Sequence, residues 1–298
     1  MIYKQVKRMK KIDKSKKFLI IGLGLLGGCY SMALKKKGYY VSAITKEQDD
    51  IDYAIQKGII DQGSTEVDIA LIENADIIVF ALYPHTFVEW IKNYGHLIKE
   101  GTILTDVTGI KGCIVYEIQS MLKPGVEFIA AHPMAGREVS GVRNSDDAIF
   151  NDANYIVVPT DKNTFGAIEL CKELGKTLGF ARISVLNPEK HDEMIAFLSQ
   201  LTHCIAVSLM CSNDNPGLVF YTGDSFRDLT RIANINDDMW SELFLSNREA
   251  LLKEMEKYRN TFDHLYECIK NNDREEMRSM MRISTERRAE FNKRYQNL

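Results

Sequence analysis

The chain of 298 residues lacks the features that would assign it to several specialised classes. Its six cysteines (residues 29, 113, 171, 204, 211 and 268) are scattered and contain no CxxC pair. This pattern indicates reduced thiols in a cytoplasmic protein, with neither a disulfide framework nor a metal site. The formal net charge is only -3, so the composition gives no general attraction to nucleic acid.

Long hydrophobic runs are absent as well. No run reaches the roughly 18 apolar residues of a membrane helix, so no membrane partner is expected. Residues 1–17 carry seven lysines and Arg8, and the apolar run 18–26 with Cys29 beyond it imitates a lipoprotein signal. The same residues make a better strand and glycine turn. We therefore expect residues 1–16 to form a solvated, partly disordered basic tail.

Strand-like and helix-like segments alternate over the first 186 residues. The apolar strand-like segments are 17–22, 39–44, 75–82, 101–106 and 126–131, and the helix-like segments between them are 25–37, 51–57, 86–97 and 112–122. Two later strands, 155–158 and 181–185, flank a helix over 165–178 and are expected to extend the same sheet. This βαβ alternation predicts an α/β fold with a doubly wound, mostly parallel sheet and helices on both faces.

The composition changes after Asn187-Pro188. From there to the end of the chain no convincing strand is visible, and apolar residues recur with the period of helices. The sequence thus predicts a Rossmann-type dinucleotide-binding domain over 17–186 and an all-helical domain over 187–298. An all-helical half with much apolar surface suggests a homodimer formed through this domain. No internal repeat or low-complexity tract is present.

A glycine motif stands between the first strand and the first helix. Gly22-Leu23-Gly24-Leu25-Leu26-Gly27 has the G-x-G-x-x-G spacing of a dinucleotide-binding turn. The first glycine permits a tight turn, the second lets the backbone approach a pyrophosphate, and the third lets the helix pack closely on the strand. The phosphates would then meet free N–H groups at the helix N-terminus. A glycine turn that binds nothing is the weaker alternative.

The acidic residue that usually holds the ribose 2′-hydroxyl after the second strand is missing. Thr45-Lys46 occupies that place, and Asp49 and Asp50 follow a few residues too late. A small hydroxyl followed by a lysine tolerates a 2′-phosphate. We therefore expect NAD or NADP as the cofactor, with NADP used at least as well as NAD.

Ligands of open α/β sheets lie beyond the carboxyl ends of the strands. Leu82, Tyr83 and Asp106 fall at that edge and are assigned to the cofactor site. The next expected strand is closed by His132-Pro133-Met134-Ala135-Gly136-Arg137-Glu138. A neutral histidine beside a nicotinamide can take the proton from an alcohol while hydride leaves its carbon. A loop histidine with a backbone hydrogen bond is the alternative, and the residues alone leave both open.

The segment from His132 to Glu138 resembles the active-site segment of the prephenate and arogenate dehydrogenase family. Other blocks similar to this family follow in its order: His191-Asp192-Glu193, then Ser199-Gln200-Leu201-Thr202-His203, then residues 223–233 with the sequence GDSFRDLTRIA, then Met239-Trp240 with Asn247 seven residues beyond the tryptophan. Together with the glycine turn, these blocks extend from residue 22 to residue 247.

The resemblance implies an NAD(P)-dependent enzyme of tyrosine biosynthesis. Its reaction would be the oxidative decarboxylation of prephenate, a small-molecule substrate, to 4-hydroxyphenylpyruvate and CO2. It implies that His132 is the base, that the planar guanidinium of Arg231 binds a substrate carboxylate, and that His203 contacts the substrate from the helical domain.

Further substrate-site roles are implied around these three residues. Glu138 would pair with Arg231 and gate entry, and Asp228 would orient the arginine segment, where Arg227 is structural. Trp240 belongs to the same site. On a regular helix Asp192, Ala196, Ser199 and His203 share one face, so Ser199 is expected to steady His203.

Two positions depart from the family pattern. Gly109 stands where the family often has a serine that helps to bind the substrate hydroxyl, and Thr108, one residue earlier, is a candidate for that role. Ser225 stands where glycine is frequent. No mutase or regulatory module is recognisable, so a stand-alone dehydrogenase is expected, with competition by tyrosine at the active site left open.

Three alternatives remain. Arogenate differs from prephenate by an amine in place of a keto group, and no residue here distinguishes the two reliably. A β-hydroxyacid dehydrogenase would need a lysine motif that has no convincing match. A non-catalytic dinucleotide-binding protein would keep the turn at Gly22 but would not need His132, His203 and Arg231 together.

Overall fold

The computed structural model describes residues 12–296, and the chain divides into two compact units between Asn247 and Arg248. Most of the basic tail expected over 1–16 lies outside the described residues. Its last part packs on the first unit instead of extending into solvent. Ile12 is buried and its carbonyl accepts a hydrogen bond from the Tyr39 hydroxyl at 2.9 Å, and Lys16 pairs with Asp76 at 3.0 Å.

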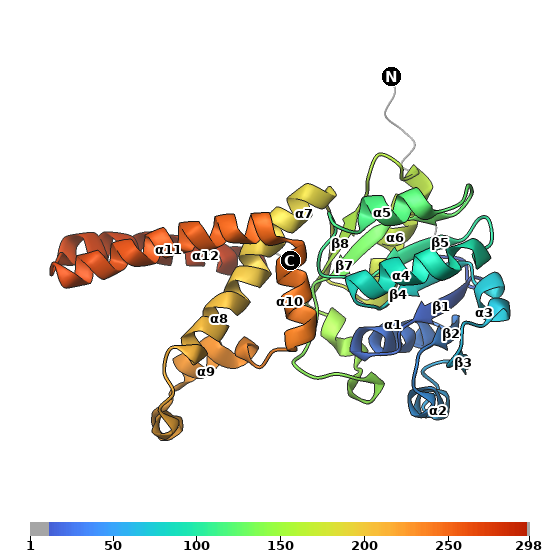
Figure 1. Ribbon diagram of the computed structural model, residues 1–298, viewed down its shortest axis with the longest axis horizontal. Coiled ribbons are helices and arrows are strands. Elements are labelled where there is room, and N and C mark those ends of the chain that lie inside the picture. Colours follow the sequence, from blue (N-terminus) through green and yellow to red (C-terminus); the bar gives the residue numbers. More distant parts are fainter. Residues whose placement is uncertain (1–11, 297–298) are drawn as a thin grey trace. The chain divides into compact units, whose positions relative to one another are not determined.

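The first unit is built on a six-stranded parallel sheet of order β3-β2-β1-β4-β5-β6 (Figure 1). The strands are β1 (Lys17–Ile21), β2 (Tyr40–Ile44), β3 (Gln62–Ser64), β4 (Ile77–Phe80), β5 (Ile103–Asp106) and β6 (Glu127–Phe128). The strand order reverses between β1 and β4, and this is the place where doubly wound sheets bind their ligands. The predicted parallel sheet is confirmed.

Helices cover both faces of this sheet. Phe18 and Ile20 of β1 lie in one core with α1 (Leu25–Lys36) and α6 (Phe165–Leu178), and α2 (Gln48–Gln56) joins them. Leu19 and Ile21 lie in a second core with α3 (Ile69–Asn74), α4 (Pro84–Tyr94) and α5 (Val115–Met121). Because successive residues of a strand point to opposite faces, a continuous apolar strand serves both cores.

The later strands do not extend the parallel sheet, so that prediction is wrong. β7 (Ala130–Pro133), β8 (Asn154–Val158) and β9 (Arg182–Val185) form a separate three-stranded sheet in which β7 and β8 are antiparallel. The segment expected as one strand over 126–131 divides at Ile129, whose N–H still bonds Leu104 of β5 at 3.0 Å. The chain then leaves β5, and β7 pairs with β8.

No strand follows β9 in the described part of the chain. The first unit ends with the helices α7 (Pro188–Ile195), η4 (Ala196–Leu201), α8 (Thr202–Cys211), η5 (Pro216–Tyr221), α9 (Asp224–Thr230), η6 (Arg231–Ala233) and α10 (Asp237–Ser246). Of these, η4 is a π-helix between two α-helices. A π-helical turn shifts the faces of the helix that follows it and often marks a functional site.

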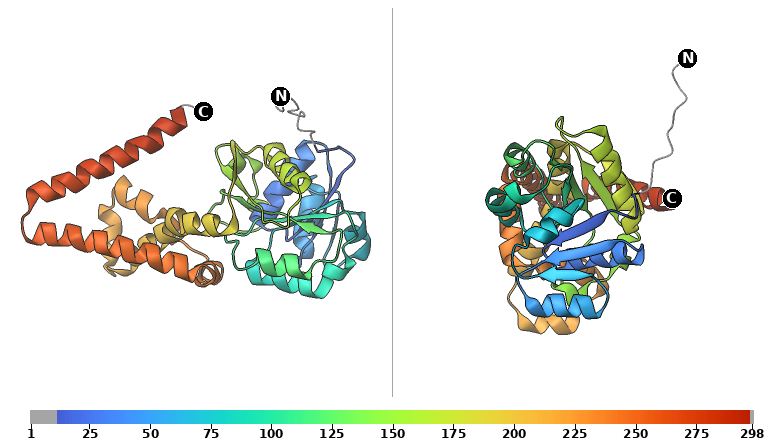
Figure 2. Two further views of the ribbon diagram at one scale, coloured as in Figure 1. Left: turned by 90° about the horizontal axis from the view of Figure 1, so that it is seen from above. Right: turned by 90° about the vertical axis from the view of Figure 1, so that its right-hand side faces the viewer.

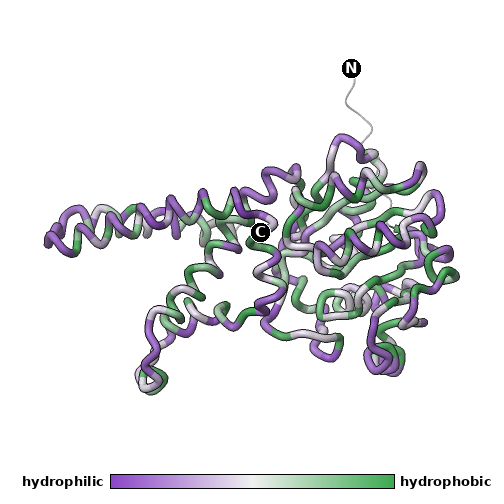
Figure 3. The backbone as a smooth tube through the Cα atoms, in the orientation of Figure 1, coloured by the Kyte–Doolittle hydropathy of each residue, from purple (hydrophilic) through white to green (hydrophobic). Residues whose placement is uncertain are grey.

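One helical stretch, 188–211, is long and apolar enough to cross a membrane by length and composition, and 28% of its apolar window is buried. Its α8 part is coloured mainly as hydrophobic in Figure 3. The stretch also carries His191, Asp192 and Gln200, which are buried and hydrogen-bonded within the first unit. Length and composition are therefore weak evidence for a membrane span here.

The second unit consists of two long helices, α11 (Arg248–Lys270) and α12 (Arg274–Gln296). They are joined by a short turn in which Asn272 has a positive φ of 56° (Figure 2). His264 of α11 contacts Glu276 of α12 at 3.1 Å. The compact units thus divide near residue 247, whereas the sequence composition changes near 187.

The glycine turn after β1 has three different geometries. Gly22 has φ +94°, and a Cβ there would lie 2.4 Å from the Ala81 carbonyl oxygen. A Cβ on Gly27 would lie 2.0 Å from the carbonyl oxygen of Gly22. Gly24 is different, because nothing lies within 4 Å of its Cβ position. The first and third glycines are thus required by the fold, and the second leaves open space.

These geometries predict a loss of stability for one alanine substitution and almost no change for another. Gly22→Ala should lower the free energy of unfolding by roughly 1–3 kcal/mol, because it combines left-handed strain with a backbone clash. Gly24→Ala should leave thermal unfolding nearly unchanged. Thermal melts of the two variants against the wild type test this. Equal stability of Gly22→Ala and Gly24→Ala would contradict the assigned geometry.

Candidate active site

A buried ion pair fixes the end of β5. Lys111 Nζ lies 2.6 Å from Asp106 Oδ2, and neither side chain is accessible to solvent. Asp106 Oδ1 accepts a hydrogen bond from the Ala131 N–H at 3.0 Å, and Lys111 Nζ donates to the Ala131 carbonyl at 2.6 Å. Both backbone polar atoms of the residue before His132 are thereby held against the end of β5.

The polar atoms of Asp106 and Thr108, which were assigned to the cofactor and substrate sites, bond to each other and to Lys111. The Thr108 hydroxyl donates to Asp106 and accepts from Lys111 Nζ at 3.0 Å, and Thr108 N–H donates to Asp106 at 3.1 Å. Both residues are buried. Their polar atoms are used within the ion-pair network, because an unpartnered polar group would be costly there. Thr108 therefore supports the loop, and its hydroxyl is already engaged within this network.

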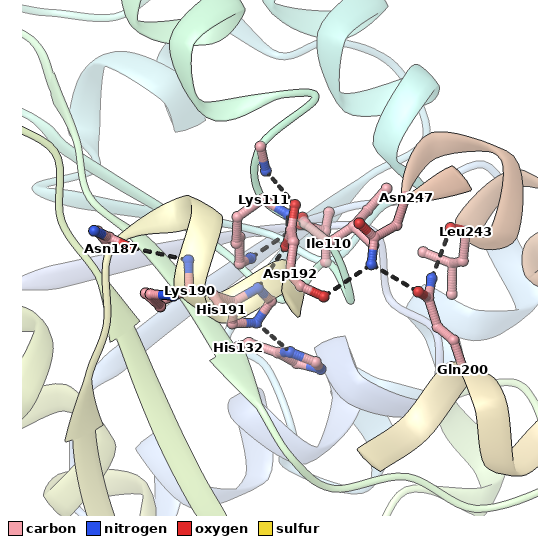
Figure 4. Close-up of polar contacts among 12 residues, drawn as sticks. Ile110, Lys111, His132, Asn187, Lys190, His191, Asp192, Gln200, Leu243 and Asn247 are labelled. Atoms are coloured by element: carbon pink, nitrogen blue, oxygen red, sulfur yellow. Dashed lines mark hydrogen bonds and ion pairs between the residues drawn. The ribbon is translucent and has the colours of Figure 1, made fainter. Parts of the chain in front are cut away.

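His132 lies in β7 and is the first member of a chain of hydrogen bonds. Its Nδ1 is 2.8 Å from Nε2 of His191, and Nδ1 of His191 is 2.7 Å from Oδ1 of Asp192 (Figure 4). Burial, followed by the nearby His191 and Lys111, holds the pKa of His132 well below its ordinary value. His132 is therefore neutral near neutral pH, and its Nε2 takes no part in this series of hydrogen bonds.

Asp192 is anchored from two sides. The backbone N–H groups of Lys111 and Gly112 donate to its two carboxylate oxygens at 2.9 and 2.7 Å. Asn247 donates to the Asp192 carbonyl at 3.0 Å and to Gln200 Oε1 at 2.7 Å (Figure 4). The loop after β5 and the helix α7 are thus fixed to each other beside His132.

Sequence reasoning assigned no site role to Lys111, His191, Asp192, Gln200 or Asn247. His191, Asp192, Gln200 and Asn247 stand inside the blocks that carry the family resemblance, and Lys111 lies two residues after Gly109. In the sequence alone the first four mark the family without showing a role. Their common role becomes visible only when their hydrogen bonds are known.

A second group of site residues gathers on the helices. Arg231 of η6 donates to Glu138, and the ring of His203 stacks on Trp240 with 3.7 Å between centroids and 29° between planes. Burial lowers the pKa of His203, opposed in part by the Ser199 carbonyl and by Glu138. The acidic end of the segment His132–Glu138 thus meets the proposed carboxylate-binding arginine.

Ser199 and Asp228 behave differently from the expectation. His203 Nδ1 contacts the backbone carbonyl of Ser199 at 2.8 Å, not its hydroxyl, because Ser199 lies in the π-helix η4 and the regular helical face is interrupted there. Asp228 of α9 is exposed, and its side chain makes no hydrogen bond with any residue that the structure describes. Arg227 instead donates to the Thr222 carbonyl at 3.1 Å and to Asp224.

The expected cofactor residues surround the glycine turn and the ends of β2 and β4. Gly24 is exposed, and α1 begins there with no side-chain cap on its N–H groups. Thr45 is half-buried and Lys46 is exposed directly after β2. Leu82 and Tyr83 follow β4, and the Tyr83 hydroxyl accepts a bond from Asn236 at 3.4 Å. The open space at Gly24 and the uncapped helix N-terminus fit a pyrophosphate.

The described residues contain no group of three or more His, Cys, Asp or Glu side chains that could hold a metal ion. The site therefore consists of a nucleotide-binding edge, a neutral histidine supported by a buried network, and an arginine–glutamate pair. A doubly wound sheet with this glycine turn and this histidine defines an oxidoreductase that uses a nicotinamide dinucleotide.

Comparison with known proteins specifies the family. Residues 30–185 match the family described as prephenate dehydrogenase, nucleotide-binding domain, and residues 187–283 match prephenate dehydrogenase, dimerization domain. The prephenate dehydrogenase of Lactococcus lactis subsp. cremoris is 32% identical over 259 residues, which cover 84% of this chain and 70% of that protein. The Bacillus subtilis prephenate dehydrogenase is 28% identical over 267 residues, with 87% and 71% coverage.

A solved structure agrees with these matches. The prephenate dehydrogenase from A. aeolicus in complex with hydroxyphenyl propionate and NAD+ has a TM-score of 0.85 and 30% identity, and covers 94% of this chain and 100% of that one. This chain belongs to the prephenate dehydrogenase family.

The buried ion pair predicts a large effect of a single substitution. Lys111→Met leaves the Asp106 carboxylate buried without its cation and should lower the free energy of unfolding by about 3–5 kcal/mol. The additional substitution Asp106→Asn should restore part of the loss. Urea denaturation measures both values.

The matched control is Lys16→Met, which removes the partly exposed pair with Asp76. Its effect should stay within about 1 kcal/mol. A loss in Lys111→Met no larger than that in Lys16→Met would contradict the role given to the buried pair.

Proposed function

We propose that this protein catalyses the oxidative decarboxylation of prephenate to 4-hydroxyphenylpyruvate and CO2 in tyrosine biosynthesis, with hydride transfer to a nicotinamide dinucleotide. The observation that carries the proposal is His132, a neutral histidine whose Nδ1 is engaged by His191 and whose Nε2 is not. Membership of the prephenate dehydrogenase family supports the choice of substrate.

His132 acts as the base in this proposal. Its Nε2 accepts the proton of the ring hydroxyl while the hydrogen on the same ring carbon leaves as hydride. The bond to the ring carboxylate then breaks, CO2 departs, and its electron pair completes the aromatic ring. The phenolate oxygen takes back the proton from His132. The oxidised nicotinamide, when bound, supplies the hydride acceptor.

Arg231 binds a substrate carboxylate, because its planar guanidinium can form two parallel hydrogen bonds to one. In the structure this position is taken by Glu138, so substrate binding would exchange one carboxylate partner for another. His203, stacked on Trp240, lies on the helix packed against η6 and contacts the substrate from the same side. Glu138 thereby becomes the gate of the site.

The cofactor is bound at the turn of Gly22, Gly24 and Gly27, where the N–H groups of Leu25 and Leu26 face the pyrophosphate. Thr45 and Lys46 lie where the ribose 2′ position is expected, and the exposed ammonium of Lys46 supports use of NADP+ at least as good as that of NAD+. Leu82 and Tyr83 border the same edge. A preference for NAD+ of a hundredfold or more in kcat/KM would refute this part.

The protein is further proposed to be cytoplasmic and to form a homodimer through its helical region, which matches the dimerization domain of the family over 187–283. The division into a dinucleotide-binding domain over 17–186 and a helical domain over 187–298 is part of the same proposal. Arogenate is the alternative substrate. Size-exclusion chromatography with light scattering tests the dimer.

The lowered pKa of His132 predicts the pH dependence of the reaction. Only the neutral imidazole can accept a proton, so a pKa below the ordinary value of about 6.5 shifts the loss of activity to lower pH. The kcat/KM for prephenate should stay on its plateau through pH 6.5 and fall only below it. An acid limb centred above pH 6.5, measured by initial rates across pH, would contradict this account.

Arg231 and Arg227 provide a matched pair of substitutions. Arg231→Ala should raise the KM for prephenate by at least ~10-fold, since a charged hydrogen bond to the substrate contributes roughly 1.5–3 kcal/mol. Arg227→Ala removes contacts only to Thr222 and Asp224 and should leave KM within a factor of about two. Steady-state kinetics measure both, and equal effects would refute the assignment.

The proposal as a whole is tested by mixing the protein with prephenate or arogenate, each with NAD+ or NADP+, and recording absorbance at 340 nm. Reduction with prephenate, and 4-hydroxyphenylpyruvate as product, is the expected result. Reduction of the dinucleotide with arogenate but not with prephenate would show that arogenate is the substrate. The absence of reduction in all four mixtures would refute the enzymatic function and favour a dinucleotide-binding protein without catalysis.

A further inference from the structure

The hydrogen bonds between Asp192, His191 and His132 have only one consistent direction. Both oxygens of Asp192 accept backbone N–H groups, from Lys111 and Gly112, so this side chain acts as an acceptor-only carboxylate. The proton between Asp192 and His191 must then reside on Nδ1 of His191. In a neutral His191 the other nitrogen, Nε2, bears a lone pair, so the proton of the next bond resides on Nδ1 of His132.

Burial keeps His191 neutral, because it lowers the pKa of this histidine. The ammonium of Lys111 acts in the same direction. The hydrogen bond to Asp192 and the carboxylates of Asp192 and Asp106 raise the pKa, but the net shift is downward. A doubly protonated His191 would donate from Nε2 and force His132 into the opposite tautomer, with its proton on Nε2.

We propose that the Asp192–His191 pair is a positioning unit that sets the tautomer of His132, so that Nε2 meets the substrate hydroxyl as a bare lone pair. This inference rests on the proposed function. Among the described residues, His191 is the one hydrogen-bond partner of the His132 ring.

The same pair serves the charged state of the base. When Nε2 accepts the substrate proton, His132 becomes an imidazolium whose Nδ1–H already donates to His191. The Asp192 carboxylate stands next in line, and its own position is fixed by two backbone N–H groups. Dipoles that are oriented before the reaction stabilise the developing charge without reorganisation. The protons on Nδ1 of His132 and Nδ1 of His191 stay where they are during this step.

Two substitutions of His191 separate positioning from packing. His191→Phe keeps a planar ring but removes the acceptor, and kcat should fall by ~10² with KM little changed. His191→Gln restores an acceptor, because its amide oxygen can receive the His132 Nδ1–H, and should recover kcat to within roughly tenfold of the wild type. The control is His96→Phe, at an exposed histidine of η1 (Gly95–Leu97), which should leave kcat unchanged.

A measurement without substrate identifies the tautomer directly. In protein labelled with 15N in its six histidines, the His132 signals are assigned by their loss in His132→Gln. The wild type should show a protonated, pyrrole-type Nδ1 and an unprotonated, pyridine-type Nε2. His191→Phe should show the reverse or a mixture, and His191→Gln should return to the wild-type pattern.

A proton on Nε2 of His132 in the wild-type protein would overturn the inference, as would unchanged kcat in His191→Phe. If His191→Phe does not fold, the test rests on His191→Gln. Loss of activity in His191→Gln, with His132 still in its wild-type tautomer, would refute the positioning role. The spectra need no substrate, so they test the tautomer independently of the reaction. If the wild-type protein carries a proton on Nδ1 of His132 but does not oxidise prephenate, the proposed function is refuted and the tautomer assignment stands.

Discussion

The ammonium of Lys111 and the carboxylate of Asp106 have no access to water, and this requirement organises the site. Each charge needs partners that solvent cannot supply, because an unpaired charge in such a place is strongly unfavourable. The partners are Thr108 and both backbone polar atoms of Ala131. The ion pair thereby joins the end of β5 to β7, two strands of different sheets, immediately before His132.

The same short loop also receives the helical part of the first unit. Lys111 and Gly112 present their N–H groups to Asp192, and Asn247 and Gln200 continue the contact to α10 through Leu243. The partners of a buried charge and the supports of His132 therefore lie on one stretch of chain. The loop that satisfies the ion pair also holds α7 beside His132.

The parallel sheet could be predicted from the sequence because its signals are local: apolar strands, helical periods and the glycine turn at Gly22. Pairing between strands is not local. Residues 155–158 carry apolar side chains at every position, which suits a strand of either sheet. Their pattern therefore did not show that β8 pairs with β7 and does not extend the parallel sheet. The π-helix η4 could not be predicted from the local pattern either. A regular helix was expected to bring the Ser199 side chain to His203, whereas His203 contacts the Ser199 carbonyl.

Motifs in the sequence pointed to His132, Arg231 and Glu138 as candidate site residues, and the structure brings Arg231 and Glu138 into contact. No motif pointed to Lys111 and Asp192 as supports, because they act through hydrogen bonds to residues 20 to 81 positions away. The surroundings of Thr108 could not be read from the sequence either. Its place suggested a ligand-facing hydroxyl, whereas in the structure this hydroxyl accepts a hydrogen bond from the buried ammonium of Lys111, three residues further along the chain.

The most direct test of the central claim is the single-turnover rate of prephenate oxidation by His132→Asn, with dinucleotide binding measured in parallel by fluorescence titration. The account predicts a rate lowered by a factor of ~10² or more, with the dissociation constant of the dinucleotide unchanged. A rate within a few-fold of the wild type would contradict the account, because it would show that the reaction proceeds without His132 as its base.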